Sequence, residues 1–180
     1  MHFKIAANEM VMSDGPGGKR ISFEVKGTPL VQQRTKMSGT TMKRTYLYDP
    51  SSEKKKEFAR TVSDEMKACG ATHFPFFSDS TAVLMNAKYV LPRPKNHFVK
   101  NKNQDRIQLT ADAMSFPRGK DIDNLNKFVT DALEGTLYAN DTNIVWGVVK
   151  KCFATDISEA VGWSELEFAK VVCTSSPSST

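Results

Sequence analysis

The sequence predicts one α+β domain, a mixed β-sheet of about five strands with two main helices packed on it. Two segments show helical hydrophobic periodicity and several short ones show strand patterns, and a chain of 180 residues can bury one sizeable core. At 39% hydrophobic and 25% charged residues, the composition is globular rather than disordered. We expect a flexible N-terminal tail over residues 1–18, a folded domain over 19–172 and a disordered tail over 173–180.

Five segments are predicted to be strands because they combine apolar runs with alternation. They cover residues 21–26, 45–48, 81–91, 143–154 and 162–172. The last two are expected to pair as a hairpin through residues 156–158. Between the first two, the polar residues 32–44 fit either a solvated loop or a mobile basic arm. Residues 98–118 are expected to form a long polar connection.

Two segments are predicted to be helices. The first runs from residue 53 to 68, where Phe58, Val62 and Met66 recur every four residues and Gly70 provides the stop. The second runs from residue 124 to 134, before Gly135. Its apolar positions form one complete face: Leu125, Phe128, Val129, Ala132 and Leu133.

Net charge, cysteine spacing and the lengths of apolar runs narrow the class of protein. Lys and Arg number 25 against 20 Asp and Glu, a net charge of +5 that favours a nucleic-acid partner only weakly. The three cysteines are far apart and lack CxxC spacing, so we expect a reduced, intracellular, soluble protein without a disulfide framework or thiolate metal site. No apolar run approaches about 20 residues, so no membrane span is expected. The N-terminus lacks the apolar core of a secretory signal.

An acidic cluster surrounds the start of the second helix. Asp121 and Asp123 are two residues apart, and in an extended segment both side chains would project to the same side. Two acids at a helix start also fit ordinary capping, with Asp123 as the N-cap residue. On this pair alone, the capping interpretation is favoured.

A lysine and two further acids add to the cluster. Lys127 follows Asp123 by four residues on one helix face, and Asp131 follows Lys127 by four. This row is either a set of surface ion pairs worth ~0.3–0.5 kcal/mol each or a support for Lys127. Asp141 lies in a turn that we expect to fold back toward the helix start. Three carboxylates and one ammonium would make a site for Mg²⁺ and phosphate, since hard cations prefer oxygen ligands.

These motifs resemble the RusA family of Holliday-junction resolvases. The resemblance rests on Asp121-Ile122-Asp123-Asn124-Leu125, Lys127, Asp131-Ala132-Leu133-Glu134-Gly135 and Asn140-Asp141, with support from Tyr48-Asp49-Pro50 and Leu91-Pro92-Arg93-Pro94-Lys95. It covers about residues 20–172 and is specific only as a combination. The sequence departs from the family pattern at Lys120, Glu134 and Asn140, none of which is a matched metal ligand.

The resemblance implies a homodimeric, Mg²⁺-dependent endonuclease, with Mn²⁺ as an alternative cation, that resolves four-way DNA junctions by paired symmetric nicks in recombination and repair. Asp121, Asp123 and Asp141 would hold the metal and act in catalysis with Lys127. Asn124 and Asp131 would support them, and Lys120 would help to bind DNA. The compartment would be the cytoplasm or nucleoid, or the nucleus or an organelle in a eukaryote.

Further basic residues are candidates for phosphate contacts, although each also fits a solvated loop charge: Arg34, Lys36, Arg93 and Lys95. Two other functions stay open at this point. The chain could be a non-catalytic module that binds branched DNA and uses its acids as caps. It could also be a nuclease for flaps, forks or RNA with the same pocket.

Overall fold

The computed structural model describes residues 4–5, 10–15, 18–41, 44–100, 107–110, 115–155 and 162–171. Two α-helices are α1 (Ser52–Ala68) and α2 (Ile122–Leu133), and two short 3-10 helices are η1 (Lys95–His97) and η2 (Asp141–Asn143). The strands are β1 (Lys4–Ile5), β2 (Val11–Gly15), β3 (Gly18–Lys26), β4 (Lys36–Thr41), β5 (Arg44–Tyr48), β6 (Val83–Leu91), β7 (Phe98–Lys100), β8 (Ile107–Leu109), β9 (Ile144–Phe153) and β10 (Trp163–Lys170).

The main sheet has six strands in the order β1-β3-β10-β6-β9, with β2 also paired to β3. All pairs are antiparallel except β6 and β9, which are parallel. A parallel pair needs a long crossover connection, and here α2 lies within the segment that links the two strands. The predicted α+β class with a mixed sheet is therefore confirmed.

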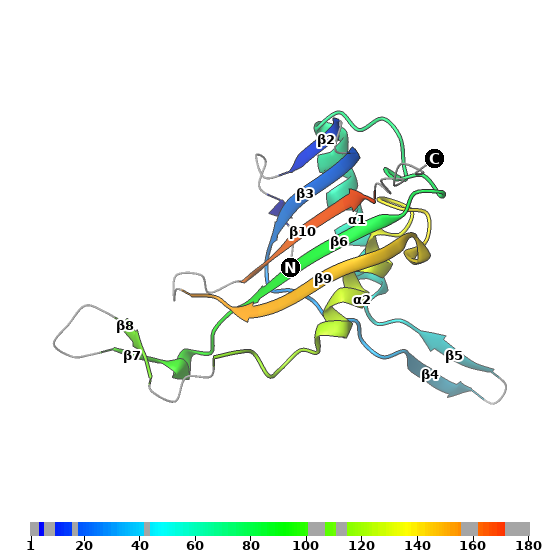
Figure 1. The fold of residues 1–180 in the computed structure, drawn as a ribbon. Helices are drawn as coiled ribbons and strands as arrows, with labels where there is room; N and C mark the ends of the chain where they lie inside the picture. Colours follow the sequence, from blue (N-terminus) through cyan, green and yellow to red (C-terminus); the bar gives the residue numbers. More distant parts are fainter. Residues whose placement is uncertain are drawn as a thin grey trace, which may run out of the picture.

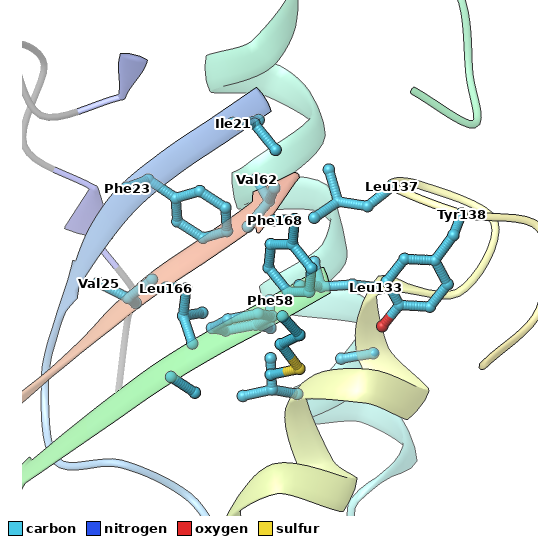
Figure 2. Close-up of a cluster of buried hydrophobic side chains, with 14 of the residues drawn as sticks. Ile21, Phe23, Val25, Phe58, Val62, Leu133, Leu137, Tyr138, Leu166 and Phe168 are labelled. Carbon is cyan, nitrogen blue, oxygen red and sulfur yellow. The ribbon is translucent and has the colours of Figure 1, made fainter. Parts of the chain in front are cut away.

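Both helices lie behind the sheet in the view of Figure 1, so they cover one of its faces. Figure 2 shows the buried core between them, where side chains of β3, β10 and α1 meet the end of α2. The rings of Phe58 on α1 and Phe128 on α2 meet edge to face, with centroids 5.9 Å apart. Every residue of the predicted apolar stripes is buried: Phe58, Val62, Met66, Leu125, Phe128, Val129, Ala132 and Leu133.

The predicted hairpin between the last two strands is wrong. β9 pairs with β6, while β10 lies between β6 and β3. Sequence proximity favours a hairpin, but the alternation of side chains carries no information about strand order. Residues 156–158, the predicted turn, lie outside the described residues.

The N-terminal segment is not only a tail. Within residues 1–18 the structure has β1 and β2, both paired to β3, and Ile5 and Met10 are buried in the core. These pairings depend on β3, so no local pattern indicated them. The predicted C-terminal tail, residues 173–180, lies outside the described residues.

Two hairpins project from the sheet. β4 and β5 pair with each other only, so the predicted strand over 45–48 is present but does not belong to the main sheet, and residues 36–41 are a strand rather than a loop. β7 and β8 form a second hairpin within the predicted connection 98–118. In Figure 1 the two hairpins extend to the left and right of the beginning of α2. Within the described part of the chain, no helix combines the length and apolarity that a bilayer crossing needs.

Candidate functional site

The first turn of α2 carries the predicted acidic pair. Asp121 is the N-cap residue with extended backbone (φ −66°, ψ 140°), and Asp123 lies in the first helical turn. The prediction that Asp123 caps the helix is therefore wrong, and the argument from an extended segment does not apply, because the helix already begins at Ile122. Asp121 makes no capping hydrogen bond with its side chain; its Oδ2 accepts from Asn124 Nδ2 at 3.4 Å. Both carboxylates are exposed.

Hydrogen bonds from distant segments hold the start of α2 in place. The Gln32 backbone N–H donates to the Asn124 carbonyl at 2.8 Å, and Lys151 Nζ on β9 donates to the Lys120 carbonyl at 2.7 Å. Lys120 Nζ itself donates to the Pro29 carbonyl. Burial, with the charge of Lys54, lowers the pKa of Lys120. The ammonium predicted to contact DNA thus has a partner within the chain.

The polar face of α2 continues with Lys127 and Asp131. Lys127 is exposed and has no ion pair with any described residue. Asp131 does not pair with it, since Asp131 Oδ2 accepts from Lys55 Nζ on α1 at 2.8 Å. The same Nζ donates to Asp49 Oδ2 at 2.8 Å, just after β5. Asp131 therefore links α2 to α1 and to the base of the β4–β5 hairpin.

Hydrogen bonds shift the pKa values of Asp49 and Lys55. For Asp49, burial opposes ionisation, but hydrogen bonds from Lys55, the Ser51 amide and Gln32 outweigh it and lower the pKa. For Lys55, burial is likewise outweighed by the bonds to Asp131 and Asp49, which raise its pKa. Asp49 and Lys55 are thus each favoured in the charged form. No local pattern indicated this role of Lys55, because its partners come from two distant segments.

Asp141 opens η2, directly before β9. The cap of this turn is Asn140, whose side chain accepts from the Thr142 amide at 3.0 Å while the Asn143 side chain accepts from the Asn140 amide at 3.1 Å. Asn143 Nδ2 also donates to the Asp79 carbonyl at 2.7 Å. An asparagine at position 140 is thus explained by capping, and the Asp141 side chain is left exposed.

The structure does not bring Asp141 to the other two aspartates within one chain. Lys151, which holds Lys120, lies seven residues beyond Ile144, the first residue of β9, and that length of strand spans about 23 Å. Asp141 and Asp121 therefore lie at opposite ends of β9, separated by a distance on the order of 20 Å. Figure 1 shows the same arrangement, with the start of α2 and the start of β9 at opposite ends of α2.

Four of the predicted DNA-contacting residues lie next to the two hairpins in the chain. Arg34 is exposed just before β4, Lys36 is the exposed first residue of β4, and Lys95 is exposed at the start of η1. Arg93 already has partners within the chain. Its Nε donates to the Ala154 carbonyl at 3.4 Å, and its guanidinium lies 4.7 Å from the centre of the Phe153 ring.

The donor set at the start of α2 consists of hard oxygens, which suits Mg²⁺ or Mn²⁺. Asp121 and Asp123 each have an exposed carboxylate. Both residues lie within three positions of Asn124 in the sequence. Across the ranges that the structure describes, no three or more His, Cys, Asp or Glu side chains gather in a way that could hold a metal ion. Among the described residues of one chain, the start of α2 thus has two carboxylates and no third beside them.

An α+β domain with exposed carboxylates and a lysine on one helix start, flanked by basic hairpins, has the features of a nuclease that uses a metal ion. The family model of the endodeoxyribonuclease RusA matches residues 26–159, and the chain belongs to the RusA family. It is an endodeoxyribonuclease, and nucleases of this family depend in general on divalent metals. A search of curated proteins found no match.

Proposed function

We propose that this protein is a homodimeric resolvase that cuts four-way DNA junctions with the help of Mg²⁺. The observation that supports this most is that the three matched aspartates have no structural task. Asp121 makes no capping bond, Asp123 is not the cap, and Asn140 rather than Asp141 caps η2. All three are exposed, and within the described residues no cation pairs with them. Asp121 and Asp123 are two residues apart, and two unpaired carboxylates that close in the chain favour a bound cation, which offsets their repulsion.

The roles follow from position. Asp121 and Asp123 would hold the cation, with Asn124 orienting the Asp121 carboxylate through its 3.4 Å hydrogen bond. A bound divalent ion would supply a Lewis acid for the scissile phosphate and lower the pKa of the attacking water. Lys127, one turn along from Asp123, would place a positive charge where phosphate charge develops. The free amides of the first turn favour an anion at the same place.

The third carboxylate would come from a second copy of the chain. Asp141 is on the order of 20 Å from Asp121 in one chain, at the far end of β9. A twofold axis that crosses β9 would exchange these ends and place each Asp141 near the partner subunit's helix start. A dimer of this kind has two equivalent sites, which fits two matched incisions in a junction with near-twofold symmetry.

The proposal is tested on synthetic four-way junctions, flaps and linear duplexes incubated with Mg²⁺. We expect paired symmetric nicks in the junction, no cutting after chelation of the metal, and binding without cutting by Asp123→Asn. Asp64→Asn is the matched control, because Asp64 is an exposed carboxylate on α1 that, among the described residues, pairs with Lys67 alone. Junction binding without cutting under any divalent ion would contradict the proposal, and so would flaps cut much faster than junctions.

Mixing two inactive variants tests whether the site is shared. Asp123→Asn and Asp141→Asn homodimers would each lack a complete site. A mixed dimer would have one complete site, composed of Asp123 from one protomer and Asp141 from its partner. We expect nicking to return in the mixture as single, unpaired incisions. If each site lay within one chain, the mixture would stay inactive.

A further inference from the structure

We infer that Lys55 is a positioning residue for DNA cutting, which fixes the β4–β5 hairpin relative to the polar face of α2. This inference rests on the proposed function, because it assigns a part in cutting to a side chain outside the acidic motif. Lys55 lies on α1, where its side chain is 15% exposed, and its Nζ is 2.8 Å from both Asp49 and Asp131. One ammonium thus joins the end of the hairpin, α1 and α2.

The β4–β5 hairpin depends on such a connection because it lies outside the main sheet. Among the strands that the structure describes, β4 and β5 pair only with each other. In Figure 1 the hairpin projects away from the sheet beside α2. A two-stranded hairpin by itself is marginally stable at best in water. The contacts at its base therefore determine where it lies relative to the rest of the molecule.

The chain that enters the hairpin is bonded to the first turn of α2. The Gln32 N–H donates to the Asn124 carbonyl at 2.8 Å. The next amide, that of Gln33, donates to Ser51 Oγ at 3.1 Å. Ser51 is only 2% exposed, so water competes little for this bond. The entry to β4 is thus held both to α2 and to the residue before α1.

The chain that leaves the hairpin is bonded to the same serine and then to α2. The Ser51 N–H donates to Asp49 Oδ1 at 2.7 Å, and Asp49 also accepts a hydrogen bond from the Gln32 side chain. Lys55 Nζ bonds Asp49 Oδ2 and Asp131 Oδ2, which completes the connection to α2. We call this closed set of hydrogen-bonded residues the anchoring network: Gln32, Gln33, Asp49, Ser51, Lys55, Asn124 and Asp131.

Lys127 lies between the two points at which the anchoring network meets α2. Asn124, Lys127 and Asp131 are at positions i, i+3 and i+7, so they share one face of the helix. Of the three, Lys127 is the exposed one. The hairpin base, with the exposed Arg34 and Lys36, is therefore fixed to α2 on both sides of the cation proposed to meet the phosphate. DNA held by the hairpin would reach Lys127 in a position that the network determines.

Alignment of this kind has a large effect on a rate. A misplacement of about 1 Å by a mutation far from the chemistry can reduce a rate by about 10²-fold. A hydrogen-bonded network resists such a shift, because its members polarise one another in a partly buried site. Loss of Lys55 would open the network and let the hairpin move relative to Lys127, while every proposed catalytic side chain remains present.

The first test is single-turnover cutting of a four-way junction with Mg²⁺ by Lys55→Met, with junction affinity measured separately without metal. We expect the cutting rate to fall by about 10- to 10²-fold. Affinity should stay close to that of the wild type, because the exposed cations are unchanged. Such a division between rate and affinity is the mark of a positioning role.

Val62→Ala is the matched control for a simple loss of stability. Val62 is fully buried on the same helix, and it belongs to the core rather than to the anchoring network. At a temperature where both variants are folded, Val62→Ala is expected to cut at nearly the wild-type rate. A wild-type rate in Lys55→Met, or an equal loss of rate in the two variants, overturns the inference.

A double-mutant cycle tests whether the network acts as one connection. Asp49→Asn breaks it on the side of the hairpin, and Asp131→Asn breaks it on the side of α2. We expect each single variant to cut slowly and the double variant to cut no more slowly than the slower single one, because a connection is lost only once. Rate losses that multiply in the double variant overturn the inference.

Amide hydrogen exchange tests the network without DNA or metal. The Gln32 amide should exchange about tenfold faster or more in Lys55→Met than in the wild type, whereas the Leu166 amide on the central strand β10 should not change. Faster exchange at Gln32 in a protein that cuts no junction rejects the proposed function and keeps the anchoring role of Lys55. Junction cutting with unchanged exchange at Gln32 keeps the proposed function and rejects this inference.

Discussion

Lys55 joins three segments that are distant in the sequence. Its side chain is 15% exposed, and its Nζ lies 2.8 Å from both Asp49 and Asp131. The four-residue spacing suggested that Asp131 pairs with or supports Lys127, but in the structure Asp131 accepts a hydrogen bond from Lys55 and links α2 to α1. A residue that matches a family motif can therefore act through the position of a helix rather than at the reacting atoms.

Replacing Lys55 by Met is expected to lower the free energy of unfolding by about 1–2 kcal/mol, because two part-buried carboxylates lose a charged hydrogen-bond donor. The measurement is the urea midpoint by circular dichroism. Lys56→Met is the control: the Lys56 side chain is 69% exposed and, in the part of the chain that the structure describes, its one ion pair is with Glu53, so the midpoint should not change. Equal midpoints for the two variants would contradict the role assigned to Lys55.

The same trio predicts a pH dependence. Hydrogen bonds hold the pKa of Asp49 below its ordinary value of 3.8, so its contribution to stability is complete above that pH and is lost as the pH falls through the folded-state pKa. The raised pKa of Lys55 removes its contribution only as the pH rises above the ordinary value of 10.5. The gap in unfolding free energy between wild type and Asp49→Asn should be constant near neutral pH and shrink below about pH 3.8. A gap that widens in acid would reverse the assigned sign.

At the scale of elements, α2 has two separate faces. Its apolar face is buried against the sheet and α1, whereas its first turn and Lys127 face solvent. The face that stabilises the helix is thus different from the face that carries the proposed chemistry. Stability and activity should respond to different substitutions on this one helix.

Phe128→Ala is expected to cost about 3–5 kcal/mol, because it removes a buried ring that meets Phe58 at 5.9 Å and leaves a cavity. Lys127→Ala, the adjacent residue, should leave the thermal midpoint near that of the wild type and reduce the cutting rate by about 10²–10³. Thermal unfolding and a junction-cutting assay on both variants check this. Loss of stability in Lys127→Ala would show that the two faces are not independent.

At the scale of the whole molecule, charge and shape together indicate how DNA would be held. The net charge of +5 is modest, but exposed basic side chains lie at the bases of two hairpins that flank the start of α2. Phosphate contacts release counterions, so affinity depends steeply on salt. Under the proposed function, the basic residues would contribute through their placement beside the start of α2 more than through their number.

Junction binding measured without metal should weaken with salt at a log–log slope of about −0.9 per phosphate contacted. Arg34→Ala and Lys95→Ala should each reduce the magnitude of that slope by about 0.9. Lys67→Ala is the control, because Lys67 lies in the last turn of α1, away from both hairpins. An unchanged slope in Arg34→Ala or Lys95→Ala would remove that residue from the proposed contact surface.

The sequence by itself determined both helices, the main strands and the acidic residues at the start of α2. Each of these is a local signal: Phe58, Val62 and Met66 recur at helical spacing, and Gly135 ends α2 where the periodicity stops. The family motif was also readable, because it depends on residue types at fixed spacing.

Only the tertiary structure determined which strands are neighbours and which distant side chains are in contact. It placed β10 between β3 and β6 and added β1 and β2 to the sheet. It also paired Asp131 with Lys55 and placed Asp141 at the end of β9 that is far from Asp121. Strand order and contacts between distant segments are chosen by the packing of the whole core, which no local window of sequence contains.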